Sequence, residues 1–285
     1  MHSTCEVEYT YPMANWNQIQ SRGNVEDRRG LGNTARVGGG ISIAGIALFL
    51  LFNYLSGGSV TDAIPQIEQQ LQGSQQQTVN SADFEGADEY EVFTSAVLGS
   101  VNDMWTDVFR QNKAVYTPPK LVLFRGGTQS ACGGASSAVG PHYCPLDKTI
   151  YIDETFFEEL QKRYKAQGGD VAEAYVIAHE VGHHVQEALG LLGATDNETS
   201  IKTELQADCF AGLWAHSIKD SGVFGPDEIR EAIDAAAAVG DDRIQKASSG
   251  RVNPESRTHG SSAERVEWFT RGYTTGTLSS CNTFR

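Results

Sequence analysis

Residues 170–189 read DVAEAYVIAHEVGHHVQEAL, and this stretch predicts one long helix. Its apolar residues recur at helical spacing and form a single stripe, made of Val171, Tyr175, Ala178, Val181, Val185 and Leu189. Asp170 can cap the start of the helix, and Glu173, three residues later, can complete a capping box. Gly190 supplies a stop, so we expect a buried helix over residues 170–192.

Two histidines lie four residues apart on this helix, so the imidazoles of His179 and His183 project from the same face. Imidazoles at this spacing can fill two positions of a tetrahedral zinc shell. Glu180 lies beside them, where it can take a proton from a water that zinc acidifies. This is the His-Glu-x-x-His pattern of zinc peptidases. His184 points about 100° away around the helix, so we expect it to be structural or to support a ligand.

A second helix is indicated after residue 199 by the spacing of Ile201, Leu205, Phe210, Leu213 and Trp214. It carries Glu204 and Asp208 on one face. Glu204 lies 21 residues after His183, which is enough chain to bring an antiparallel helix back to the metal. A glutamate as third ligand leaves the fourth zinc position for water, and Asp208 would accept a hydrogen bond from a ligand histidine. The alternative for Glu204 is an exposed helix carboxylate.

A third segment, THGSSAERV at residues 258–266, contains two candidates for stabilising the oxyanion that forms when water attacks a carbonyl. These are His259 and Arg265, and a purely structural role remains open for each. Ser261 or Ser262 can cap a final helix that follows.

An uncharged, largely apolar stretch at residues 38–55 has about the length that spans a bilayer. Four arginines precede it, at positions 22, 28, 29 and 36, and the next Lys or Arg is Arg110. This asymmetry predicts an uncleaved single-span anchor with residues 1–37 in the cytoplasm and the remainder exported. A cleaved signal peptide and a buried core helix are the alternatives. Residues 56–87 are rich in Gln, Ser and Gly, which predicts a flexible tether before a domain at residues 88–285.

Four of the five cysteines lie on the predicted exported side, where disulfides persist. Cys132 and Cys144 share one Gly/Ser/Ala-rich loop, so Cys132–Cys144 is the simplest local pairing, which leaves Cys209–Cys281. Four cysteines permit three connectivities, and free buried thiols are the other alternative. The net charge of −14 argues against non-specific nucleic-acid binding, which requires Lys and Arg to neutralise phosphates.

Several stretches together resemble the bacterial neutral zinc metallopeptidases. They are NVEDRR at residues 24–29, YTPP at 116–119, SACG at 130–133, GPHYCP at 140–145, AHEVGHH at 178–184, ELQADCFAG at 204–212, VGDDR at 239–243, residues 258–269 and CNTF at 281–284. The resemblance covers residues 112–284 with the short N-terminal signature. Residues 1–12 resemble nothing in that family, so we predict native translation from Met13.

The resemblance implies a zincin-like domain with one zinc ion per chain, at the membrane of a bacterial cell. The second helix and the 258–269 segment are also similar to those of membrane-associated gluzincin peptidases, which implies Glu204 as third ligand and a His259/Arg265 pair near the intermediate. Gly260 stands where those enzymes usually have proline.

We therefore expect an α+β fold, with a small sheet built from residues 121–124 and 149–153 over the zinc-binding helix. Further helices are expected at residues 88–111, 200–219, 227–239 and 262–271. The expected activity is hydrolysis of peptide bonds in exported or membrane-associated proteins or peptides. A zinc-stabilised binding or regulatory module without turnover is the alternative, although a structural zinc site needs no residue such as Glu180.

Overall fold

The computed structural model describes residues 14–29, 88–136, 139–166, 168–193, 196–225 and 227–284 of the chain. The predicted membrane span at 38–55 and the tether at 56–87 lie outside these residues. Within the described part of the chain, no helix combines the length and the apolar character that a bilayer crossing requires.

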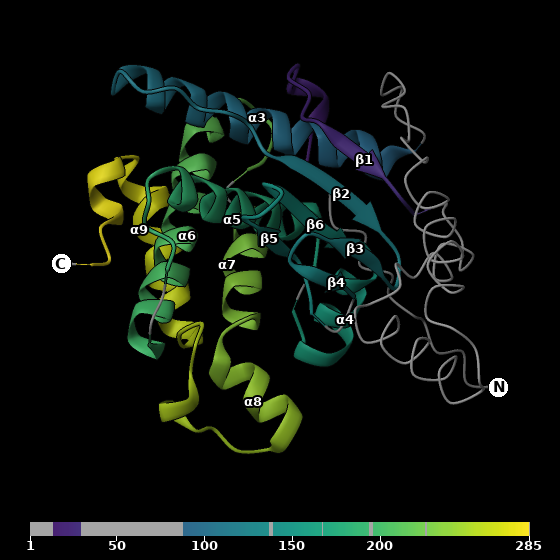
Figure 1. Ribbon diagram of the computed structural model, residues 1–285, viewed down its shortest axis with the longest axis vertical. Coiled ribbons are helices and arrows are strands. Elements are labelled where there is room, and N and C mark those ends of the chain that lie inside the picture. Colours follow the sequence, from purple (N-terminus) through teal and green to yellow (C-terminus); the bar gives the residue numbers. More distant parts are fainter. Residues whose placement is uncertain are drawn as a thin grey trace, which may run out of the picture. The chain divides into compact units, whose positions relative to one another are not determined.

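A four-stranded sheet forms one side of the domain (Figure 1). Its strands, in spatial order, are β1 (Val25–Asp27), β2 (Lys120–Phe124), β6 (Thr149–Asp153) and β5 (His142–Cys144). β1, β2 and β6 are parallel, and β5 runs antiparallel to β6 at the edge. The central strands β2 and β6 are apolar runs buried almost throughout, as is typical of parallel strands covered on both faces. The predicted sheet is therefore confirmed.

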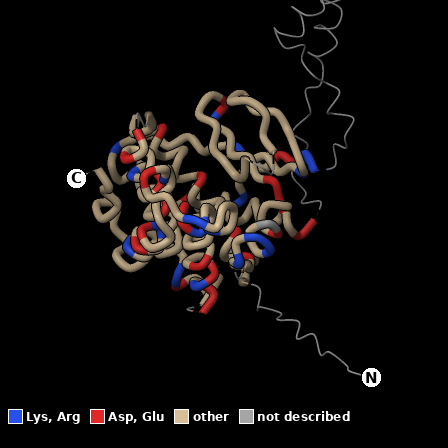
Figure 2. The backbone as a smooth tube through the Cα atoms, turned by 90° about the horizontal axis from the view of Figure 1, so that it is seen from below, with Lys and Arg blue, Asp and Glu red and all other residues tan. Residues whose placement is uncertain are grey.

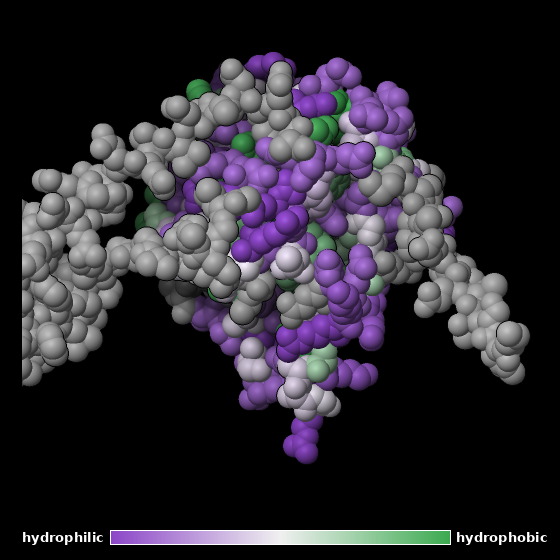
Figure 3. All heavy atoms as spheres, turned by 90° about the vertical axis from the view of Figure 1, so that its right-hand side faces the viewer, coloured by the Kyte–Doolittle hydropathy of each residue, from purple (hydrophilic) through white to green (hydrophobic). Residues whose placement is uncertain are grey.

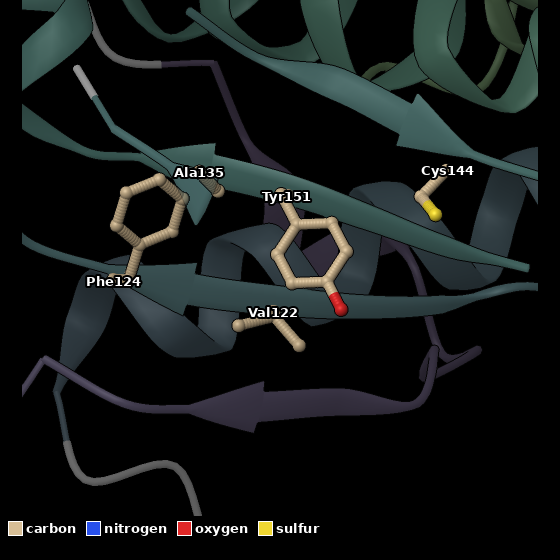
Figure 4. Packing of buried hydrophobic residues seen from close by; sticks show 5 residues of the cluster. All are labelled: Val122, Phe124, Ala135, Cys144 and Tyr151. Carbon is tan, nitrogen blue, oxygen red and sulfur yellow. The ribbon is translucent and has the colours of Figure 1, made fainter. Parts of the chain in front are cut away.

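A small hairpin covers part of this sheet. It consists of β3 (Thr128–Ser130) and β4 (Gly133–Ala135), and the disulfide Cys132–Cys144 ties its turn to β5. Figure 4 shows the cluster beneath it, in which Val122, Phe124, Ala135, Cys144 and Tyr151 pack together. The predicted local pairing of these two cysteines is confirmed.

Helices make up the rest of the domain and match most of the expected ranges. They are α3 (Glu89–Gln111), α4 (Thr155–Tyr164), α5 (Asp170–Ala188), α6 (Asn197–Ile218), α7 (Ile229–Ala238), α8 (Asp241–Ser249) and α9 (Ser262–Thr275). α5 packs against α3, α6 and α7, and α6 packs most extensively on α9. Acidic and basic positions are interspersed along these elements (Figure 2), and the face in Figure 3 is mostly hydrophilic. The mixed α+β architecture is confirmed.

The N-terminal residues 14–28 belong to the same compact unit as the residues from 88 onwards. They form a 3-10 turn, η1 (Trp16–Gln18), followed by β1. Val25 pairs with Leu121 in the sheet, and the backbone N–H of Gly23 donates to the Ser95 carbonyl of α3 at 2.8 Å. A Cβ atom at Gly99 would lie 2.7 Å from the backbone of Arg22, so this glycine permits the close approach of segment and helix.

This packing differs from the predicted division of the chain, which separated residues 1–37 in the cytoplasm from an exported domain beginning at residue 88. β1 and β2 share a hydrogen-bonded ladder, and strands in such a ladder lie about 5 Å apart. A bilayer has a hydrocarbon core about 30 Å thick, so strands on opposite sides of it could not pair. Residues 14–28 therefore lie on the same side of any membrane as the domain.

Candidate metal centre

The centre is built on α5, whose start differs from the sequence prediction. Gly169, with φ of +106°, occupies the N-cap, and Asp170 is the first helical residue. The Asp170 carboxylate does not cap the helix because it accepts hydrogen bonds from the backbone N–H of Ala14 and from Nε1 of Trp16. The helix ends at Ala188, four residues before the predicted end, and Gly190 follows with φ of +69°.

A glycine in the motif sets how closely the two metal-binding helices approach. α6 begins at Asn197, where the Asp196 side chain accepts a hydrogen bond from the backbone of Thr199. A Cβ atom at Gly182 of α5 would lie 3.1 Å from Cα of Ala207 on α6. The small residues at this crossing bring the carboxylate of Glu204 against the histidine face of α5.

The three predicted ligands meet at this crossing. Nε2 of His179 lies 3.3 Å from Oε2 of Glu204, and Nε2 of His183 lies 3.4 Å from Oε1. One ligand atom from each of the three side chains falls within 4.8 Å of the other two. Two imidazoles and one carboxylate are the donor set of catalytic zinc sites that keep a position open for water. The residues fit a zinc ion, and they are a candidate metal group of the described chain.

Each histidine is oriented by a hydrogen bond at its other ring nitrogen. Nδ1 of His179 lies 2.9 Å from Oδ1 of Asp208, as the sequence predicts, and Nδ1 of His183 lies 2.9 Å from Oε1 of Gln186. Gln186 in turn donates to the Thr203 carbonyl on α6. Bonds of this kind hold the ring so that Nε2 faces the metal. Gln186 was not foreseen; the signal available was a glutamine one turn after His183, on the same face of the helix as the two histidines.

Asp208 is also the partner of Arg265. Its two carboxylate oxygens accept from Nε and Nη2 of Arg265 at 2.8 and 2.9 Å, and Tyr175 donates to it at 2.6 Å. Burial opposes ionisation of Asp208, but the charge of Arg265 and the bond to His179 hold its pKa below the ordinary value. Arg265 is buried and directs its bidentate contact at Asp208, while Nη2 also lies 3.8 Å from Oε2 of Glu204. Its observed contacts therefore orient the ligands.

Glu180 lies beside the metal group, next to His179 in the chain. The residue is buried and lines the cavity at the centre. Its Oε2 atom has no hydrogen-bond partner among the described residues. A buried carboxylate oxygen without a partner is costly, so the native site is expected to supply a hydrogen-bond donor to it.

His259 approaches the same cavity from the loop between α8 and α9. Its side chain is 52% exposed, and its Nδ1 lies 3.2 Å from Oδ1 of Asp241. The other oxygen of Asp241 accepts from the backbone N–H groups of Thr258 and His259. The Asp241 hydrogen bond is the main cause that raises the pKa of His259. Asp241 was not foreseen as a site residue. The one signal in the sequence was its position in the VGDDR stretch that resembles the family.

The backbone conformation at Gly260 explains why this position does not hold the proline that membrane-associated gluzincin peptidases usually have. Its φ is +89°, a region that proline, fixed near −65°, does not reach. The backbone N–H of Asp241 donates to the Gly260 carbonyl, so the loop is fastened to the start of α8 on both sides of His259.

His184 faces away from the metal group, as predicted. Nδ1 lies 2.9 Å from the Tyr143 hydroxyl on β5, and Nε2 lies 2.7 Å from the Thr117 carbonyl. Burial lowers the pKa of His184, which favours the neutral ring. This histidine joins α5 to the sheet.

The cavity at the centre has a volume of about 770 Å³. Its polar wall contains the metal group, Glu180, His259 and Arg265. The lining also includes apolar and aromatic side chains, those of Phe156, Leu160, Tyr164, Val176, Val239 and Ile244. The edge strand β5 contributes His142 and Tyr143 to the rim. Such a cavity can hold a peptide segment with an apolar side chain.

The second predicted disulfide is present and lies behind the metal group. Cys209 follows Asp208 on α6 and is bonded to Cys281 at the end of the turn η4 (Leu278–Cys281). Gln206 also donates to the Cys281 carbonyl at 3.0 Å. The C-terminal tail is thereby fixed to the helix that carries Glu204.

Comparisons with known proteins agree with this geometry. The family described as "Putative neutral zinc metallopeptidase" matches residues 14–284. The uncharacterized protein YpfJ of Escherichia coli K12 is 40% identical over 284 residues, covering 94% of this chain and 98% of the relative. The uncharacterized protein Rv2575 of Mycobacterium tuberculosis H37Rv is 49% identical over 185 residues, covering 59% of this chain and 63% of the relative. No solved structure matches the chain significantly. The chain belongs to the neutral zinc metallopeptidase family.

Proposed function

We propose that the protein is a zinc-dependent endopeptidase that hydrolyses peptide bonds in exported or membrane-associated proteins or peptides. One observation carries the proposal: the buried Oε2 of Glu180 lacks a partner beside three side chains suited to one zinc ion per chain. A zinc site that only stabilises the fold would need no such base at an open cavity.

Zinc, when bound by His179, His183 and Glu204, supplies a Lewis acid that polarises a carbonyl and acidifies water. Glu180 would accept a proton from the attacking water at Oε2 and deliver it to the leaving amine. His259 would donate from Nε2 to the oxygen that becomes negative, because its Nδ1 is engaged by Asp241. Arg265 would keep Asp208 ionised and His179 oriented, and its charge near Glu204 would favour negative charge in the site.

The substrate would enter along the exposed edge of the sheet. β5 is the edge strand and lies at the rim of the cavity, so an extended peptide could pair with it by strand addition. The apolar side chains that line the cavity would take a large hydrophobic side chain next to the cleaved bond.

The two disulfides suggest a domain that folds outside the cytoplasm. We further propose that the stretch at residues 38–55 attaches the protein to the bacterial cell membrane. Because β1 pairs with β2, residues 14–28 accompany the domain on the exported side in this proposal.

A casein-type unfolded protein tests the activity. The zinc-loaded protein should cleave it, and the matched variant Glu180→Gln should bind zinc equally and cleave at least about 100-fold more slowly. Equal cleavage by both proteins would remove Glu180 as the base. Stoichiometric zinc without cleavage of any unfolded protein or exported-protein mixture would favour the alternative, a zinc-stabilised binding module.

A further inference from the structure

The start of the metal-binding helix holds the N-terminal segment through one carboxylate. Oδ2 of Asp170 accepts from the backbone nitrogen of Ala14 at 2.8 Å and from Nε1 of Trp16 at 2.7 Å. Ala14, Trp16 and Asp170 are each at most 8% exposed. Asn15 donates to the Val223 carbonyl, and Trp16 packs edge-on against Phe93. Residues 14–16 are therefore fixed in the domain by contacts with Asp170, Val223 and Phe93.

Two further carboxyl groups, those of Glu173 and Glu231, lie close enough to Asp170 to feel its charge. Glu231 accepts from the backbone of Val171, and burial together with the charge of Asp170 raises its pKa to about 7. Burial and the same charge raise the pKa of Glu173 to about 8, and its Oε2 is buried without a hydrogen-bond partner among described residues. No ion pair between described residues joins these three carboxyl groups to a lysine or arginine. Carboxyl groups with raised pKa values bind protons at neutral pH, and a cation placed beside them would favour their ionised form.

The residue before Ala14 is a methionine, and the family match starts at Ala14 itself. Translation from Met13 would place a small residue second, and initiator methionine is removed before small residues. Hydrolysis of the Met13–Ala14 bond consumes one water, releases methionine with the new carboxylate and leaves an amine at Ala14. A free α-amino group has a pKa near 8, so it takes up a proton at neutral pH.

We propose that the mature chain begins at Ala14 and that its α-ammonium group is bound by Asp170 at the first turn of the metal-binding helix. An ammonium group offers three N–H donors where a peptide offers one, so it can keep the bond to Asp170 and bind a further acceptor. A charge-assisted bond is about twice as strong as a neutral one. The amine-binding residue is thus Asp170, with Glu173 and Glu231 as neighbouring carboxyl groups, and its ligand is produced by processing of the chain.

The first test is the mass of the protein expressed from Met13. The intact mass should equal that of residues 14–285 with two disulfides, and retention of Met13 would overturn the proposal. Amine-selective labelling at pH 7 then reports on the docked group without any mutation. The Ala14 amine should react at least about 10-fold more slowly in the folded protein than in a free peptide of residues 14–22. Equal rates would mean that the amine is not bound.

A double-mutant comparison separates the charge from the hydrogen bonds. Asp170→Asn should lower Tm by several degrees in the chain that begins at Ala14, and by clearly less in the chain that begins at Met1, which lacks an amine at this position. Asp227→Asn, at an exposed carboxylate, serves as the matched control and should change neither. The same loss of Tm in both chains would show that Asp170 binds only the peptide N–H, and the proposal would fail.

Discussion

Two histidine–aspartate pairs face the same cavity and differ in burial. In His179–Asp208 the aspartate side chain is completely buried, and it also binds Arg265 and Tyr175. In His259–Asp241 the histidine is half-exposed and the aspartate binds two backbone N–H groups of its own loop. The first pair joins α5, α6 and α9, whereas the second belongs to one loop and the start of α8. The two pairs thus contain the same two residue types, but they differ in how deeply the histidine is buried.

This difference in burial indicates that the His179–Asp208 pair is suited to binding a metal ion and the His259–Asp241 pair to transferring a proton. A buried, multiply bonded aspartate fixes one ring geometry, which a metal ligand requires. A half-exposed pair leaves Nε2 of His259 accessible to substrate and lets the ring exchange protons with water. Loss of Asp208 should therefore affect metal binding and folding together, whereas loss of Asp241 should affect mainly the pH dependence of turnover.

The largest effect is expected for Asp208→Asn. It leaves the buried Arg265 without its carboxylate, which typically costs 3–5 kcal/mol of unfolding free energy when one partner of a buried pair is removed. It should also weaken zinc binding by about 10- to 100-fold. Urea unfolding and a zinc-chelator competition measure the two effects. If Asp208→Asn binds zinc as tightly as Asp241→Asn does, the distinction between the pairs is wrong.

Proton release on zinc binding is the next test. Burial lowers the pKa of His179, but the Asp208 bond and charge outweigh it and raise that pKa to about 9 in the metal-free protein. His179 therefore carries a proton at pH 7 that zinc has to displace, so zinc affinity falls as the pH is lowered. Calorimetry at pH 7 in buffers of different ionisation enthalpy should detect the released proton. Asp241→Asn should leave this release unchanged. If the native protein releases no proton when it binds zinc, the assignment of His179 as a protonated ligand is wrong.

Removal of the second disulfide should have an intermediate effect. Cys281→Ser opens a loop of 72 residues, for which chain entropy gives about 4 kcal/mol, although measured losses are often smaller. Because α9 carries Arg265 and precedes η4, turnover should fall before the domain unfolds, with zinc retained. Parallel zinc, activity and unfolding measurements on the reduced and variant proteins check this order. Loss of zinc before loss of activity would contradict it.

The smallest effect is expected for Asp241→Asn. Asp241 raises the pKa of His259, and the protonated ring is the form that can donate Nε2–H to the substrate. Without the carboxylate that pKa falls, so the alkaline limb of the kcat/KM profile should move to lower pH. The unfolding free energy should change less than in Asp208→Asn, because Asp241 is buried but its partner His259 has a side chain that is 52% exposed. An unmoved alkaline limb would show that His259 is not the group that titrates.

The metal group could be predicted from the sequence because its information is local. Helical periodicity places His179 with His183, and Glu204 with Asp208, on shared faces before any tertiary contact is known. Gln186 and Asp241 were not predicted because their roles depend on contacts with residues distant in sequence. Gln186 bonds to α6 across the helix crossing, and Asp241 bonds to the loop that contains His259. The same holds for Asp170, whose expected cap is replaced by bonds to Ala14 and Trp16.

The topology was predicted less well for a physical reason. The hydropathy and the arginine positions of residues 1–55 contain no information about which distant segment these residues contact. β1 is only three residues long and becomes a strand by pairing with β2. Such a short element has no periodicity of its own to detect. α4 and α8 were missed as well; α4 ends at Lys165 in a left-handed conformation instead of at the glycine that usually marks a helix end.

The zinc content of three purified proteins tests the central claim most directly. The native protein and Glu180→Gln should each contain one zinc ion per chain by elemental analysis, whereas His183→Ala should contain almost none while its disulfides remain intact. Glu180→Gln should at the same time have lost its activity, because Glu180 acts on the water and does not bind the metal. Full zinc content in His183→Ala, or loss of zinc in Glu180→Gln, would contradict the assignment of ligands and base.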